Sequence, residues 1–337
     1  MSIESKNLIF VFLILFLVAV SPFFATAFGA ADIQLADVWA ALSCQLGGGC
    51  TLSSITQRII IELRLPRVIL AFLAGSGLAI SGAVLQTVTR NPLADPYLFG
   101  ISAGASFGAV LVIAAVGAAS GLSLTLGAFA GGAAAVLIVI AMAGTGVQIE
   151  RMLLAGVATS FMFSAATNLV LYSSDPEAAA SWLFWSLGSF TRAEWDGLWL
   201  PLLVIVFGLS LFLLFSRQLQ TLLAGDESAR TMGVEAGRLR IGMLLVSSLI
   251  TATLVAYCGG IGFVGLMIPH LVRRIIHVNT TLTLLITALV GGVFMVWVDV
   301  LARQLIENRE LPIGVITAAV GSGFFLLVLK RPRWGDD

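Results

Sequence analysis

The residues of this sequence best suited to chemistry are the ionisable side chains that lie inside apolar stretches. Asp299 is the one acidic residue well inside such a stretch, and Arg303 follows it one helical turn later. Residues four apart lie on the same helix face, so this spacing favours a structural ion pair over a proton relay. A proton-coupled carrier, which keeps ionisable groups within the membrane, is the alternative.

Motifs for enzymatic chemistry are absent from the sequence. A phosphate-binding P-loop requires a lysine after glycine, and the only lysines are Lys6 and Lys330 at the two ends. His270 and His277 have no neighbouring thiolates or carboxylates that would complete a metal site. The 18 basic and 18 acidic residues balance, which gives no indication of nucleic-acid binding. We therefore expect no catalytic residue, no metal site and no cofactor in this chain, and no nucleic-acid partner.

Composition decides the solvent in which these residues are placed. Of 337 residues, 59% are hydrophobic and 11% are charged, with a mean hydropathy of +1.04. A soluble domain carries about 25% charged residues. Lipid offers the backbone no hydrogen bonds, so only helices or closed barrels can span it, and apolar runs of about 20 residues without alternation select helices. We expect an all-α, polytopic membrane protein with a single transmembrane domain over residues 1–337.

Ten segments are predicted to span the membrane. The first ends near Ala25-Thr26-Ala27, which is typical of a signal cleavage site, but its length favours a retained span. The longest polar connections are two external loops, 29–64 and 173–197, and an internal loop, 216–240. The predicted spans are 8–28, 65–89, 97–117, 121–143, 152–172, 198–215, 241–257, a short one at 262–273, 281–301 and 312–329.

The distribution of positive charge predicts the orientation of these spans. Twelve of the 18 Lys and Arg residues fall on the side of the N-terminus, which favours both termini in the cytoplasm. Cys44 and Cys50 then lie in the first external loop. Their spacing permits a disulfide in an oxidising compartment, and two free thiols are the equal alternative.

Two patterns within the spans concern packing and a path. Gly75, Ala79 and Ala83 recur every four residues and predict close helix packing. Polar residues recur every three to four positions in the fifth span and form a stripe on one helix face, with Thr167 adjoining it. The stripe could line a water-filled path or hydrogen-bond to neighbouring helices. Its members are Ser160, Ser164, Asn168 and Tyr172.

The internal loop 216–240 carries a compact charged segment. Leu222, Leu223, Ala229 and Met232 are spaced for a short amphipathic helix, which Gly233 would close as a C-cap. Such a helix exposed between spans should dock against the membrane surface, the protein itself or a partner.

Three external arginines oppose the charge bias. Arg64 and Arg67 flank Pro66 at the start of the second span, and Arg303 follows the ninth. They could extend toward lipid phosphates or dock an acidic partner.

Long segments of the sequence resemble the permease subunits of the FecCD family. These are the large importers of the ATP-binding cassette class for iron–siderophore chelates, haem and vitamin B12. The resemblance covers essentially the whole chain. The segments that carry it are ELRLPRVILAFLAGSGLAISGAVLQTVTRNPLADPYLFGISAGASFGA (62–109), GGIGFVGLMIPHLVRR (259–274) and ELPIGVITAAVGSGFFLLVLKR (310–331).

The resemblance implies partners and residue roles. We expect two cytoplasmic subunits that bind ATP and Mg, a periplasmic binding protein, and a second permease, either another copy or a sister chain. Arg64, Arg67 and Arg303 match family positions that dock the binding protein, and Asn91 and Leu93 match an inner gate. The segment that would couple to the ATPase contains Leu222, Leu223, Ala224, Gly225, Asp226, Glu227, Ala229, Arg230, Met232 and Gly233.

The function expected from the resemblance is import across the bacterial inner membrane. The chain would form the path for a bulky metal chelate, with an iron–siderophore complex preferred and haem or vitamin B12 as alternatives. A proton-driven carrier and a membrane-embedded assembly subunit are the readings from other classes.

Overall fold

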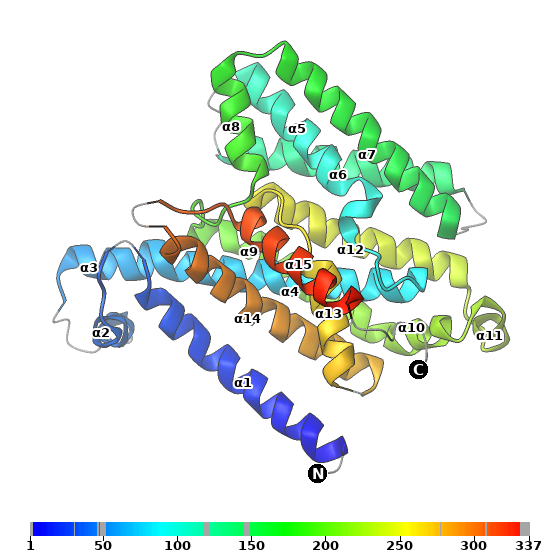
Figure 1. Cartoon of the computed structure of the whole chain (residues 1–337), viewed down its shortest axis with the longest axis horizontal. Helices are drawn as coiled ribbons and strands as arrows, with labels where there is room; N and C mark the ends of the chain where they lie inside the picture. Colours follow the sequence, from blue (N-terminus) through cyan, green and yellow to red (C-terminus); the bar gives the residue numbers. More distant parts are fainter. Residues whose placement is uncertain are drawn as a thin grey trace.

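The structure is a computed structural model that describes residues 3–29, 31–45, 47, 52–116, 121–144, 149–276, 278–306 and 309–330. Regular structure in these ranges is helical, apart from one isolated bridge between Ile306 and Arg309. Most helices run close to one long axis. Figure 1 shows two short helices, α2 and α3, at one end of this axis and two others, α10 and α11, at the opposite end.

Each of the ten predicted spans corresponds to a helix of the described chain. Seven helices are long and apolar enough to cross a membrane, two further apolar helices are shorter, and the short eighth span is α13. In chain order they are α1 (Ile3–Ala27), α4 (Leu65–Thr89), α5 (Ile101–Val116), α6 (Gly121–Ala143), α7 (Ile149–Tyr172), α9 (Trp195–Leu214), α12 (Ala236–Cys258), α13 (Val264–Ile275), α14 (Thr280–Gln304) and α15 (Ile313–Leu329).

The predicted loops contain helices of their own, which the composition did not reveal. A π-helical turn joins α3 to α4, so one continuous helix of 36 residues begins in the expected loop 29–64. Pro66 has no N–H and its ring displaces the carbonyl one turn earlier, and the wider turn before it accommodates that loss. The additional elements are α2 (Leu35–Gln45), α3 (Ser54–Arg58), η1 (Ile59–Arg64), η2 (Pro96–Phe99), α8 (Pro176–Ser186), α10 (Ser216–Leu223) and α11 (Asp226–Thr231).

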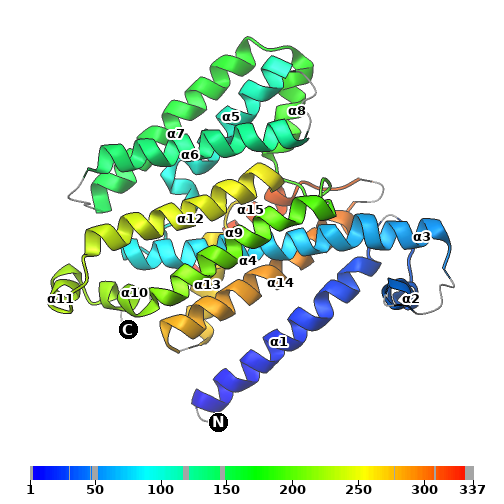
Figure 2. The same cartoon turned by 180° about the vertical axis from the view of Figure 1, so that it is seen from behind.

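Helix α4 forms the centre of the bundle. It is almost wholly buried, and it packs against α9, α12, α13 and α14 (Figure 2). Its contact with α14 is close because Gly75 faces Gly291, and a Cβ on Gly75 would overlap the Gly291 carbonyl oxygen. The predicted packing role of Gly75 is therefore confirmed, since small residues let two backbones approach.

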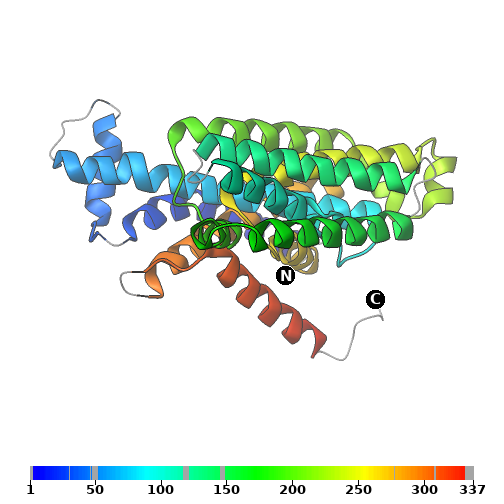
Figure 3. The same ribbon diagram turned by 90° about the horizontal axis from the view of Figure 1, so that it is seen from above.

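Two parts of the chain lie to the side of this centre. Helices α5, α6, α7 and α8 pack together as one group, with α7 at its outer edge (Figures 1 and 2). Helix α15 runs along another edge, where it contacts α13 and α14 (Figure 3). Both α7 and α15 leave large apolar side chains exposed, among them Phe161, Leu169, Leu326 and Leu327.

Candidate functional site

The segment predicted to be one amphipathic helix is two helices. The chain breaks at Gly225, whose φ of +109° is strained for residues with a Cβ, so α10 ends before it and α11 begins after it. Gly233 has a φ of +79°, and the N–H of Val234 donates to the Ala229 carbonyl at 2.9 Å. The predicted C-cap at Gly233 is thus confirmed, and the single helix is corrected to a bent pair.

The two helices present only some of their predicted coupling residues to the outside. Leu222 and Ala229 are fully buried against the bundle. Leu223 and Met232 are instead 55% and 65% exposed. Ala224, Glu227 and Arg230 are exposed as well, while Gly225 and Asp226 are half-buried. The segment therefore combines an inner face that anchors it and an outer face free to meet a partner.

An ion cluster attaches this segment to two spans. Asp226, the first residue of α11, accepts from Arg240 of α12 at 2.6 and 2.8 Å, and Arg90 lies 3.1 Å from the same carboxylate. The Arg240 guanidinium is buried and also donates to the Val88 carbonyl at the end of α4. The hydrogen bond from Arg240 and the nearby arginine charges hold the pKa of Asp226 below its usual value. We call Asp226, Arg240 and Arg90 the inner cluster.

The turn after α4 lies beside the inner cluster and is held by hydrogen bonds within the turn itself. Arg90 ends α4 in the left-handed region, with a φ of +49°. Asn91 then accepts from the Leu93 N–H at 2.9 Å through its side chain, which forms an Asx turn. Leu93 is exposed and Asn91 is half-buried, so both remain accessible. Their role as an inner gate stays a prediction.

Asp95 is a buried acid in this turn that the sequence reading missed. It accepts from the Tyr97 N–H at 2.8 Å, and the Tyr97 hydroxyl accepts from the Ile261 N–H. Burial raises the pKa of Asp95 to about 6. The turn after α4 is thus joined to the segment before α13 by the Tyr97 hydroxyl, and Asp95 holds the backbone of Tyr97.

The polar stripe lies on the exposed edge of the molecule. Ser164, Asn168 and Tyr172 are exposed on α7, and Tyr172 is 90% exposed. Ser160 is half-buried and donates to the Gly156 carbonyl, which satisfies it within its own helix. The stripe therefore faces away from this chain's bundle, where a second permease could complete a path, and its role in conduction stays a prediction.

The three external arginines are engaged within the chain. Arg64 is buried and donates to the carbonyls of Ala27 and Ala31, both at 2.6 Å, so it holds the link between α1 and α2. Arg303 is also buried and donates to the Phe28 carbonyl in the same link. Arg64 and Arg303 therefore neither extend toward lipid phosphates nor lie free on the outer surface. Their docking role stays a prediction, and it requires that they exchange internal partners.

Asp299 joins two of these arginines, Arg67 and Arg303, in one cluster. It is fully buried and lies 2.9 Å from Arg303, the predicted pair, and 2.8 Å from Arg67. Arg67 also binds Glu310 at 2.8 Å, in the segment between α14 and α15. The ion pair read from the spacing is confirmed, but Arg67 and Glu310 are more than 200 residues apart and left no local signal. We call Arg64, Arg67, Asp299, Arg303 and Glu310 the outer cluster.

The cysteines divide as the sequence allowed. Cys44 is disulfide-bonded, and Cys258 is a buried free thiol. Cys50, the predicted partner of Cys44, lies outside the described residues. Among the described residues no group of three potential ligands is placed to hold a metal ion. His277 lies outside the described residues.

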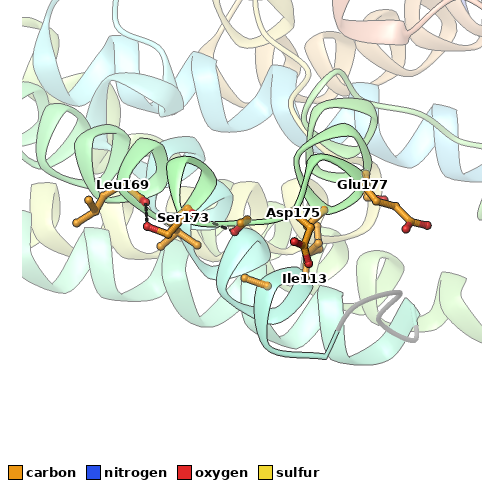
Figure 4. A pocket seen from close by; sticks show the side chains of 10 residues that line it. Ile113, Leu169, Ser173, Asp175 and Glu177 are labelled. Carbon is orange, nitrogen blue, oxygen red and sulfur yellow. Dashed lines mark hydrogen bonds between the residues drawn. The ribbon is translucent and has the colours of Figure 1, made fainter.

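A cavity of about 540 Å³ opens where α7 turns into α8. Ile113 of α5 forms its apolar wall, and Ser173, Asp175 and Glu177 bring polar groups to it (Figure 4). Ser173 donates to the Leu169 carbonyl at 3.1 Å. The cavity lies at the same end of α7 as Tyr172, and its oxygen atoms could accept hydrogen bonds from a polar cargo.

Comparison with known proteins gives consistent results for sequence and fold. The model of the FecCD transport family matches residues 13–331. The chain is 38% identical over 276 residues to the cobalamin import system permease protein BtuC of Halobacterium salinarum, covering 81% of this chain and 74% of that protein. It is 36% identical over 307 residues to the Fe(3+)-citrate import system permease protein YfmD of Bacillus subtilis, covering 90% and 89%.

A solved structure shares the arrangement of helices. It is described as an inward-facing conformation of a metal-chelate type ABC transporter, and it is 31% identical with a TM-score of 0.84. The match covers 95% of this chain and 98% of the other. The similarity therefore extends over the inner cluster, the outer cluster and the α7 stripe.

Proposed function

The chain belongs to the FecCD transport family, and from that premise we propose that it forms the membrane path for an iron–siderophore complex in an ATP-driven importer. Members of this family are permease subunits that work with a separate ATPase. This chain would then supply a path, two gates and two docking faces, while ATP and Mg bind to the partner.

The α10–α11 segment is the observation that carries the coupling part of this proposal. Its outer face exposes Leu223 and Met232, two large apolar side chains at the end of a helix bundle where a water-soluble partner could bind. Its inner face is attached through Asp226 to α12 and to the end of α4. A partner that moves this segment would therefore pull on α12 and on the end of α4, which leads into the 90–96 turn.

The proposed cycle needs only differential binding. ATP closes the two ATPase subunits and favours one arrangement of the α10–α11 segments, and the loaded binding protein favours another at the opposite end. Each ligand shifts the same two-state bundle by its difference in affinity for the two states. The outer cluster, with Arg67 and Glu310 at its rim, is where we expect the binding protein to dock.

A second permease is part of the proposal because α7 and α15 leave faces uncovered. Phe161 and Leu169 are exposed on α7 beside the polar stripe, and Leu326 and Leu327 are exposed on α15. Pairing would bury apolar residues and place the stripes of two chains opposite each other. With both termini in the cytoplasm, the α10–α11 segments of both chains would meet the two ATPase subunits.

Cargo is proposed from the family and not from a particular pocket. The relatives described above are named for cobalamin and for ferric citrate at nearly equal identity. The alignment with the ferric citrate permease is the longer and covers more of both chains. An iron chelate is therefore the first choice, with vitamin B12 and haem as alternatives.

The proton-coupled reading finds little support in the outer cluster. A relay needs a carboxylate that can gain and lose a proton while its surroundings change. Asp299 is held between Arg67 and Arg303 and is fully buried, which suits a fixed structural role.

Uptake of labelled cargo tests the proposal. Cells with and without this chain would be compared for import of ferric siderophores, haem and cobalamin, with the chain restored from a plasmid as the control. We expect loss of a ferric siderophore alone. Loss of cobalamin or haem instead would replace the cargo and keep the importer, whereas no change with any of the three would contradict the proposed cargo class.

A further inference from the structure

A cleft of about 870 Å³ lies at the α10–α11 end of the bundle, beside the outer face of the α10–α11 segment. It is bounded by the end of α9, by α10, and by the start of α12. Its lining includes Met232 and Gly233 of the predicted coupling segment, together with Arg217, Gln218, Arg238 and Gly242.

The rim of this cleft is basic. Arg217 and Arg238 are both exposed, and they stand on different helices on either side of it. Arg238 pairs with Glu235 one turn away at 2.8 Å, and both side chains are largely in solvent, so this pair is weak. In the described part of the chain Arg217 forms no ion pair. Arg217 is therefore left without a counterion among the described residues.

Part of the lining of the cleft is apolar, with Leu211, Leu239 and Val246 among its residues. A small soluble anion would satisfy the arginine and leave these side chains uncovered. A molecule with both an anionic head and a hydrocarbon chain would cover both.

We propose that the cleft binds an anionic phospholipid of the adjacent leaflet. The phosphate would lie between Arg217 and Arg238, and an acyl chain would follow the groove between α9 and α12. Arginine forks recognise phosphate oxygens through paired donors, and basic pockets between spans are suited to anionic head groups. Gln218 lines the same cleft, and its Oε1 is shielded from solvent with no partner among the described residues. It could accept from a head-group hydroxyl such as that of phosphatidylglycerol.

The test compares spin-labelled phosphatidylglycerol with spin-labelled phosphatidylcholine bound to the full importer in vesicles containing both lipids. The unaltered protein should retain phosphatidylglycerol preferentially. Arg217→Gln should reduce that preference about fivefold, since one basic residue near the surface contributes about that factor. Arg274→Gln is the matched control, because Arg274 is exposed at the end of α13 on the same side and outside the cleft, and it should leave the preference unchanged.

A second pair of variants fills the groove without changing charge. A Cβ added at Gly242 or at Gly237 would meet no atom within 4 Å, and both residues lie in α12, but only Gly242 lines the cleft. Gly242→Phe should displace the retained phosphatidylglycerol, and Gly237→Phe should not. Equal thermal stability of the two variants in detergent is the check that both fold.

Two results would overturn the proposal. The first is equal retention of the two lipids by the unaltered importer. The second is a preference present in the isolated permease that disappears when the ATPase binds, which would make the cleft part of the ATPase contact. Because neither readout involves cargo, the proposal can fail while the proposed import function stands.

Discussion

The outer and inner clusters solve the same electrostatic problem at opposite ends of the bundle in different ways. At the outer end a fully buried carboxylate, Asp299, lies between two arginines and joins α4 to α14. At the inner end Asp226 is over a third exposed and stands on a helix of six residues. A buried pair cannot open without stranding a charge, whereas a half-exposed one can exchange partners with water. The outer cluster therefore forms a fixed link between two spans, and the inner cluster forms a link that can open and close.

The largest effect should follow removal of the buried charge. Asp299→Asn leaves Arg67 and Arg303 facing each other without their shared counterion, and breaking a buried pair costs about 3–5 kcal/mol. We expect a large loss of folded protein and of thermal stability in detergent. Glu310→Gln is the matched control, since Glu310 is 46% exposed and its loss should cost about 1 kcal/mol or less. Equal losses of stability in the two variants would contradict the distinction between the buried Asp299 and the exposed Glu310.

A smaller and different effect is expected at the inner cluster. Asp226→Asn should cost less stability than Asp299→Asn, because Asp226 is partly exposed to solvent and the buried Arg240 keeps its hydrogen bond to the Val88 carbonyl. It should weaken the link from α11 to Arg240 and Arg90, and lower transport per ATP hydrolysed about tenfold. Hydrolysis and uptake would be measured together in proteoliposomes. Glu150→Gln, which alters an exposed acidic residue at the start of α7 and outside the coupling segment, should change neither. Parallel loss of hydrolysis and uptake in Asp226→Asn would show that the inner cluster is needed for ATPase binding and does not transmit movement from α11 to the spans.

Lowering the pH should change the contributions of Asp226 and Asp95 to the stability of the fold in opposite directions. The pKa of Asp226 is lowered, so its contribution to stability is present above about pH 4 and is lost as the pH falls through its folded value. Because the pKa of Asp95 is raised to about 6, its folded form prefers the proton, and this contribution declines as the pH rises from about 4 to 6. Asp95→Asn should therefore gain thermal stability relative to the unaltered protein between pH 4 and 7. A constant difference across that range would contradict the raised pKa.

The smallest effect should come from the break between the coupling helices. Gly225→Ala places a Cβ at a φ of +109°, which costs about 1 kcal/mol and favours straightening of the α10–α11 bend. Coupling should fall by a factor of a few, measured as uptake per ATP. Gly237→Ala, within α12 and free of contacts, should have no such effect.

How far the sequence predicted these two regions depends on the range of the interactions. The spans followed from long apolar runs, and the Asp299–Arg303 pair followed from a spacing of four, because both are local patterns. Arg67, Glu310 and the Asp226–Arg240 link join residues that only the fold brings together, so spacing could not reveal them. The positive φ of Gly225 was also hidden, because glycine is common in loops and in spans alike.

The helices within the expected loop 29–64 were missed for a related reason. The segment was identified as a polar connection between spans, but α3 and a π-helical turn within it continue α4 outward. The roles of Arg64, Arg67 and Arg303 in docking, of Asn91 and Leu93 in gating, and of the α7 stripe in conduction remain predictions. Each depends on a partner surface that this chain alone does not supply.

ATP-dependent uptake in proteoliposomes tests the central claim most directly. The chain would be reconstituted with its ATPase and binding protein, and ferric siderophore entry would be followed with and without ATP and with an imposed proton gradient. The account predicts entry that requires ATP, is indifferent to the gradient, and falls about tenfold in Asp226→Asn while hydrolysis continues. Entry driven by the gradient in the absence of ATP would contradict it.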